Sequence, residues 1–267
     1  MARARMVLVA LMWMVPAAAL AHEPGEHPFD PNLRVNPSLE DCSVQFSPFL
    51  TQDAFRRFAR EFGSVSAFKM MAPPTTLGRG GIAVELEQIS FTVEERAPAW
   101  NETFAHPDGY HELGSDLAFP KLRLRVGVTD DIDVGAFYTK NLNANYGWFG
   151  LEGKYGLLQQ SEAKPVTLAL RAAYTKTLYV TDMDMHAITA DVSAGRTFRG
   201  MLTPYLGLGS DLVLVRETTD VVALQSEEQV VPHAFAGLQL RYWHVTLGAE
   251  ANWGELTSLQ FQLGAAF

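Results

Sequence analysis

Apolar and polar residues alternate with a period of two along most of the segment from Gly80 to Phe267. Successive side chains of a β-strand point to opposite faces, so this alternation places one face in an apolar medium and the other in a polar one. We find about ten such runs with no helical period between them, which favours an antiparallel all-β chain over parallel βαβ folds. In a typical run, the apolar series is Leu122, Leu124, Val126 and Val128, alternating with Lys121, Arg123, Arg125 and Gly127.

The runs also have the length that a membrane crossing requires, because a tilted strand needs about ten residues to cross a bilayer. The mean hydropathy of +0.00 fits a soluble protein, but it also fits a transmembrane barrel, in which the two series cancel. Only the N-terminus has an apolar run approaching the length of a membrane helix, so a helical bundle is excluded. We predict a single antiparallel transmembrane up-and-down β-barrel over residues 80–267, with about ten strands and with eight or twelve as alternatives.

Connection lengths support this prediction. If both ends of the barrel lie on the periplasmic side, the two longest connections, roughly 95–117 and 217–229, fall on the outer side. The connections at 129–132 and 199–202 are then short inner turns, a distribution typical of outer-membrane barrels. The first strand changes phase near Gln88, which indicates either a β-bulge or a misplaced strand boundary.

The first 79 residues lack the alternation. Residues 1–21 combine two arginines, a short apolar core and a small-residue cleavage pattern, which indicates a secretory signal peptide. We expect residues 22–79 to form an extended tail and a short amphipathic helix on the periplasmic side. The helix, TQDAFRRFAREFG at 51–63, places three phenylalanines on one face, namely Phe55, Phe58 and Phe62. That face suits a membrane surface, but packing on the barrel or plugging its end is the favoured interpretation.

Two motifs in the barrel segment resemble known proteins. The terminal run FQLGAAF, which ends at Phe267, resembles the C-terminal signal by which bacterial outer-membrane proteins are recognised for assembly. The segment RVGVTDDIDVGAFYTK looks like a strand-turn-strand unit of outer-membrane barrels, and the 51–81 stretch with APPTTLGRGG is similar to one uncharacterised proteobacterial barrel family. The resemblance implies residence in the bacterial outer membrane, with its lipid and the barrel-assembly machinery as partners. It brings no activity with it.

The polar series is expected to face the lumen, where lone charges would be costly and ion pairing is expected. Glu85 and Glu87 on the first strand would then neighbour Arg123 and Arg125 on the second. Because a ten-stranded barrel is only slightly wider than one that side chains fill, we expect a largely closed lumen. A narrow polar pore for small solutes is the alternative. The predicted ion-pair network comprises Glu85, Glu87, Arg123, Arg125, Glu152, Lys154, Arg171, Asp191, Arg241 and Glu250.

Motifs for chemistry are weak. The net charge of -9 argues against nucleic acid as a partner, and a single cysteine excludes a disulfide scaffold. We expect no cofactor and no metal site, although His106, Asp108 and His111 share one long loop. An Asp-His group at the outer rim, around His186 with Asp182 and Asp184, keeps a barrel enzyme as an alternative; Ser193 and Ser258 are lipase candidates by residue type alone.

The sequence therefore predicts a non-enzymatic outer-membrane barrel that presents surface loops or forms a narrow passage. Two alternatives stay open, the barrel enzyme and a soluble periplasmic lipocalin-like barrel.

Overall fold

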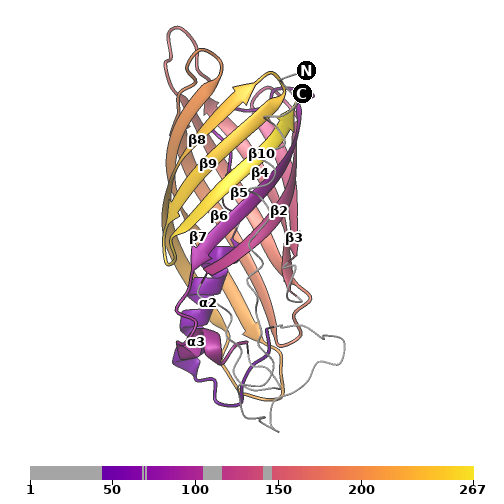
Figure 1. The fold of residues 1–267 in the computed structure, drawn as a ribbon, viewed down its shortest axis with the longest axis vertical. Helices are drawn as coiled ribbons and strands as arrows, with labels where there is room; N and C mark the ends of the chain where they lie inside the picture. Colours follow the sequence, from indigo (N-terminus) through magenta and orange to yellow (C-terminus); the bar gives the residue numbers. More distant parts are fainter. Residues whose placement is uncertain (1–43, 68, 70, 105–115, 141–145) are drawn as a thin grey trace, which may run out of the picture.

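The computed structural model describes residues 44–67, 69, 71–104, 116–140 and 146–267, and the strands within them close into a barrel (Figure 1). Each strand pairs antiparallel with the next, and the first pairs with the last, which confirms the predicted ten-stranded up-and-down barrel. No helix in these ranges is long and apolar enough to cross a membrane. The elements are α2 (Gln52–Ser66), β1 (Ile82–Thr92), α3 (Pro98–Asn101), β2 (Asp116–Gly127), β3 (Ile132–Lys140), β4 (Gly147–Leu158), β5 (Thr167–Leu178), β6 (Met183–Gly195), β7 (Leu202–Glu217), β8 (Glu227–Tyr242), β9 (Val245–Trp253) and β10 (Ser258–Ala266).

The two ends of the barrel differ. Strand β1 begins and β10 ends at the same end, where the amide of Ile82 donates to the carbonyl of Phe267 at 3.0 Å. We call this the inner end and the opposite one the outer end, following the orientation expected of a barrel with both strand termini in the periplasm. The helices α2 and α3 lie at the outer end (Figure 1).

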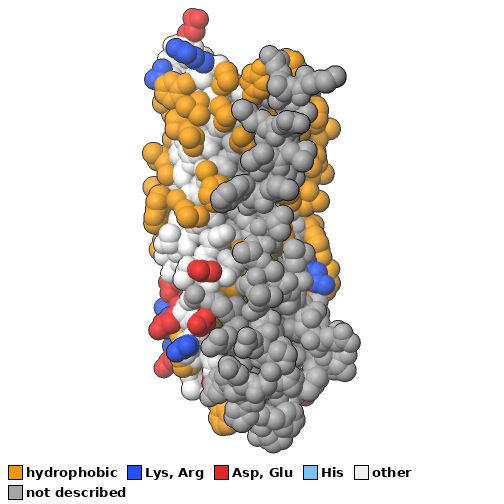
Figure 2. All heavy atoms as spheres, in the orientation of Figure 1, with side chains coloured by type: hydrophobic (Ala, Val, Ile, Leu, Met, Phe, Trp, Pro, Cys, Tyr) orange, Lys and Arg blue, Asp and Glu red, His pale blue; other side chains and the backbone are white. Residues whose placement is uncertain are grey.

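The outward-facing side chains form an apolar belt. Exposed leucines, valines and isoleucines alternate with buried residues on the strands of the wall. On one face, Figure 2 shows hydrophobic side chains gathered on the half of the barrel nearer its inner end. Leu206 and Leu208, for example, are each 61% exposed. Water would penalise an apolar surface of this extent, so the belt marks a wall that lies in lipid. The chain is thus built as a transmembrane barrel of the bacterial outer membrane, and its polar interior is the reverse of a soluble lipocalin-like barrel.

Strand β1 passes Gln88 without interruption. Its register with both β2 and β10 is continuous there, and Ile89 and Phe91 point inward like Glu85 and Glu87 before them. Both explanations of the phase change, a bulge and a misplaced boundary, are therefore wrong. The interior itself changes from polar to apolar toward the outer end of the barrel.

The segment before β1 runs through the barrel. Thr51 caps α2 by accepting a hydrogen bond from the amide of Ala54 at 3.3 Å, and the helix continues to Ser66 beyond its predicted end at Gly63. The described residues after α2 contact the wall at mid-height through Lys69 and near the inner end through Leu77, so the segment leads back to the inner end. This path puts α2 at the end of the barrel opposite the start of β1 and the end of β10, which is the outer end as named above. We call the described residues from Val44 to Leu77 the plug.

Candidate functional site

The plug helix fills the outer end of the barrel with aromatic side chains. Phe55, Phe58 and Phe62 are at most 1% exposed. Phe58 and Phe62 stack on each other at 4.9 Å, and Phe58 meets the ring of Trp100 in α3 edge-on at 5.5 Å. The predicted apolar face thus packs inside the barrel and not on a membrane surface. Further rings complete this aromatic cluster, namely Phe104, Phe119, Tyr146 and Trp148.

Three arginines on the other side of α2 connect it to the rim. Arg56 pairs with Glu227 at the start of β8 at 3.2 Å, and Arg60 pairs with Glu255 in the β9–β10 turn at 3.2 Å. Arg57 pairs with Glu61 in its own helix and with Glu94 after β1. Hydrogen bonds to Glu61 and Glu94 raise the pKa of Arg57 above its ordinary value, so this arginine stays charged. The helix is therefore fixed to three separate parts of the rim.

Below the helix, the plug binds the wall through a buried ion pair. Lys69 Nζ lies 3.1 Å from Asp211 Oδ2 on β7, and the Asp211 side chain is fully buried. Asp211 also accepts a hydrogen bond from Thr189 on β6 at 2.7 Å and lies 3.2 Å from His233 Nδ1 on β8. Three neighbouring strands thus hold one carboxylate against the plug lysine.

Near the inner end, the wall binds the plug backbone. Lys154 Nζ donates to the carbonyl of Thr75 at 2.6 Å, and the amide of Leu77 donates to Asp133 Oδ1 at 3.0 Å. Lys154 and Asp133 also pair with each other at 3.1 Å. Both charged side chains of the wall at this level thus bind the backbone of the plug.

Between these levels, the charged side chains of β1 to β6 form one network. Arg123 Nε donates to Glu152 at 2.9 Å and its guanidinium lies 3.3 Å from Glu87. The network continues on one side from Glu87 to Lys121 at 2.5 Å, and on the other from Glu152 to Arg171 at 3.7 Å. Two further pairs join it, Arg125–Glu85 at 3.0 Å and Arg171–Asp191 at 2.9 Å.

With the plug included, six cations face six carboxylates within ion-pair distance in the described lumen. We call this set the lumen network. Within this set the two signs balance, so the paired charges themselves give no preference for a permeating cation or anion. Its members are Lys69, Lys121, Arg123, Arg125, Lys154, Arg171, Glu85, Glu87, Asp133, Glu152, Asp191 and Asp211.

The structure brings together eight of the ten residues expected in the ion-pair network and places two elsewhere. Arg241 is exposed at the inner turn, where its Nε donates to the carbonyl of Trp243 at 3.3 Å. Glu250 is buried in the lumen but accepts its hydrogen bonds from Tyr205 and Asn252, both at 2.8 Å, and from no cation among the described residues.

Sequence reasoning missed four members of the lumen network. Lys121, Asp133 and Asp211 lie on the inward-facing series of β2, β3 and β7, so the alternation itself could have identified them. Lys69 precedes the barrel and has no periodic signal. Only the path of the plug through the lumen reveals its role.

The opposite wall, on β8 to β10, has fewer titratable side chains facing inward, namely Glu227 at the outer mouth, His233 and Glu250. Gln260 and Gln262 are at most 1% exposed, and neither side-chain amide has a hydrogen-bond partner among the described residues. Buried polar groups without a protein partner are usually satisfied by water.

The residues considered for chemistry do not assemble a catalytic group. His186 Nε2 lies 3.2 Å from Asp184, and its Nδ1 contacts the hydroxyl of Tyr174, so both ring nitrogens are engaged on the outer wall. Asp182 instead accepts from the amide of Phe46. Ser193 and Ser258 have no histidine opposite them on either neighbouring strand.

No group of three or more potential metal-ligating side chains occurs in the described ranges, and His106, Asp108 and His111 lie outside those ranges.

No protein-family model and no curated protein matches the sequence. Among solved structures, the chain is similar to Ail, the attachment invasion locus protein of Yersinia pestis, at 14% identity, covering 71% of this chain and 99% of Ail with a TM-score of 0.32. The N-terminal β-barrel domain of Pseudomonas aeruginosa OprF gives 10% identity, the same two coverages and a TM-score of 0.32. The KdgM porin gives 8% identity, 69% and 99% coverage and a TM-score of 0.35. At these values the similarity is one of architecture, and the function has to be argued from the residues of this chain.

Proposed function

We propose that this protein is a non-enzymatic outer-membrane barrel whose lumen is closed by its own N-terminal segment and whose role is to present surface loops. The observation that carries the proposal is the plug, which contacts the wall at the outer mouth, at mid-height and at the inner end. The plug also binds charged side chains of the wall, because Lys69 pairs with Asp211 and the amide of Leu77 donates to Asp133. Both ring nitrogens of His186 are engaged, by Asp184 and by the Tyr174 hydroxyl, which favours this role over an enzyme built on that histidine.

A second candidate is a narrow passage for small polar solutes. The observation in its favour is the unpartnered amides of Gln260 and Gln262, which suit a strip of water along β9 and β10. In this candidate the plug narrows the lumen without sealing it.

Conductance across a planar bilayer distinguishes the two. We expect the purified protein to give no steady conductance above that of the bare membrane. The F58S/F62S variant should give discrete conductance steps, because polar residues in the aromatic cluster release α2 from the mouth. D53N is the matched control on the same helix and should stay silent, since the Asp53 side chain is 92% exposed. Steady conductance of the unaltered protein would refute closure and support the passage.

A further inference from the structure

The outer wall carries a cationic and aromatic patch near the outer end. Lys140, Lys176 and Arg216 are exposed on β3, β5 and β7, and His186 lies between the last two on β6. Within the described chain, Arg216 has no ion pair or hydrogen bond. Two carboxylates lie beside these cations on the outward face, Asp184 at 3.7 Å from Lys176 and Glu228, which is exposed on β8 opposite Leu214. On an acidic protein, this outward surface therefore has an excess of positive charge. We call Lys140, Lys176, His186 and Arg216, with Asp184, the outer-wall patch.

Two tyrosines lie beside the outer-wall patch, at the edge of the apolar belt. Lys140 Nζ lies 5.4 Å from the centre of the Tyr179 ring, and the Tyr179 hydroxyl is 3.1 Å from that of Tyr138. Tyr179 has a φ of 65°, a left-handed conformation that is costly for a tyrosine. Tyrosine and lysine together are typical of the boundary between hydrocarbon and headgroups.

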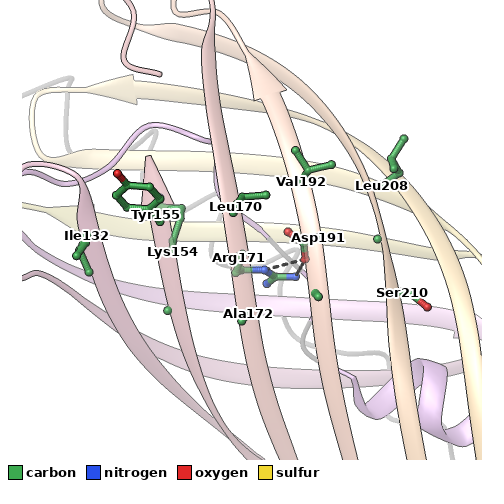
Figure 3. Close-up of a pocket in the computed structure, with 13 residues that line it drawn as sticks. Ile132, Lys154, Tyr155, Leu170, Arg171, Ala172, Asp191, Val192, Leu208 and Ser210 are labelled. Carbon is green, nitrogen blue, oxygen red and sulfur yellow. Dashed lines mark hydrogen bonds and ion pairs between the residues drawn. The ribbon is translucent and has the colours of Figure 1, made fainter. Parts of the chain in front are cut away.

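A shallow groove lies on the same strands, farther into the belt (Figure 3). Its volume is about 790 Å³, within the range of ligand-binding clefts. Small residues opposite one another on β4 to β7 make its floor, namely Gly153, Ala172, Ala190 and Ser210. Leu170, Val192 and Leu208 line one side of it, again as direct cross-strand neighbours.

The outer-wall patch and the groove are close enough for a single lipid molecule to contact both. On β5, Lys176 is four residues from Ala172, and on β6, His186 is four residues from Ala190, which corresponds to about 13 Å along a strand. Tyr174 stands between the two levels on β5 and binds His186, so it connects them. A lipid whose headgroup binds the patch would therefore have the apolar groove about 13 Å farther into the membrane, where its acyl chains lie.

We propose that this outer wall binds one phosphate-bearing lipid of the outer leaflet, with its phosphate at the outer-wall patch and one acyl chain in the groove. Ammonium and guanidinium groups suit phosphate because they form charge-assisted hydrogen bonds with it. The small residues of the floor let a chain approach the backbone more closely than elsewhere on the belt. The proposal concerns the lipid face and does not depend on whether the lumen is closed.

Native mass spectrometry of the delipidated protein in detergent tests this assignment with three probes: dimyristoyl phosphatidic acid, dimyristoyl glycerol and inorganic phosphate. We expect phosphatidic acid to bind about tenfold more tightly than the other two, because only it offers both parts. K176Q/R216Q should remove its advantage over dimyristoyl glycerol. A190L should weaken the binding of both lipids by filling the groove.

Two control variants test whether a substitution elsewhere on the barrel changes lipid binding. K164Q changes an exposed lysine of the inner β4–β5 turn, and A249L changes an exposed alanine of the belt on β9; both should bind as the unaltered protein does. Heat-modifiable mobility on gels checks that every variant is folded. Equal binding of the two lipids, or unchanged phosphatidic acid binding in K176Q/R216Q and A190L, would overturn the proposal. So would a change in self-association alone with A190L, which would assign the groove to a second copy of the chain.

Discussion

Lys69 is the single residue through which the extended part of the plug makes an ion pair with the described wall. Its side chain is 5% exposed, and Asp211 opposite is not exposed at all. Removing one partner of a buried pair leaves the other charge uncompensated, so K69M should lower the free energy of unfolding by about 3–5 kcal/mol. Urea unfolding in micelles, followed by tryptophan fluorescence, measures this change.

The double variant K69M/D211N removes both charges and should recover part of that loss. K164M, an exposed lysine of an inner turn, is the control and should change the free energy of unfolding by less than about 1 kcal/mol. A double variant as unstable as K69M would show that the ion pair is not what holds the segment.

Phe267 illustrates a residue whose proposed role lies outside the folded structure. Its side chain is 68% exposed and its ring stacks on His244 at 4.9 Å, so it adds little to the packed interior. If it is an assembly signal, F267S should reduce the fraction of heat-modifiable barrel in the outer membrane severalfold, while the barrel that does form unfolds normally. F198S, at another exposed phenylalanine of the inner end, is the comparison. Equal yields for the two variants would argue against the signal.

At the scale of elements, α2 is held by two kinds of contact whose magnitudes differ. Phe58 is fully buried in the aromatic cluster, so F58A should cost about 3–5 kcal/mol of the helix's local stability. Arg60 is 40% exposed in its pair with Glu255, so R60Q should cost less than about 1 kcal/mol. Hydrogen exchange of the α2 amides measures both, and equal effects would contradict the dominance of apolar packing.

The same element shows what the sequence could predict. Period-two alternation predicts the strands and the inward-facing charged residues, because the direction of a strand side chain depends only on its position along the strand. The alternation could not predict that Ile89 and Phe91 stay inward, since the apolar partner of that face is α2, which ends fifteen residues before β1. The prediction that Arg241 belongs to the ion-pair network was wrong for a related reason. Arg241 keeps its parity, but β8 ends at Tyr242, and at a strand end the side chain reaches water.

At the scale of the whole molecule, the barrel has two zones. Strands β7 (Leu202–Glu217) and β8 (Glu227–Tyr242) are longer than the roughly 9–11 residues that a tilted strand needs to cross a bilayer. Toward the outer end the interior becomes apolar. The exterior becomes charged there, as Figure 2 shows for one face. The inner zone is thus built for lipid, and the outer zone resembles a soluble domain with its own core.

This division predicts the topology of the protein in cells. A short epitope inserted after Asp220, in the β7–β8 connection of the outer zone, should bind antibody on intact cells. The same epitope after Glu162, in the β4–β5 turn of the inner end, should bind only once the outer membrane is permeabilised. Both residues are exposed, so accessibility of the site does not distinguish the two insertions. The reverse labelling pattern would place α2 and the aromatic cluster in the periplasm, and it would remove the basis for a surface-presenting role.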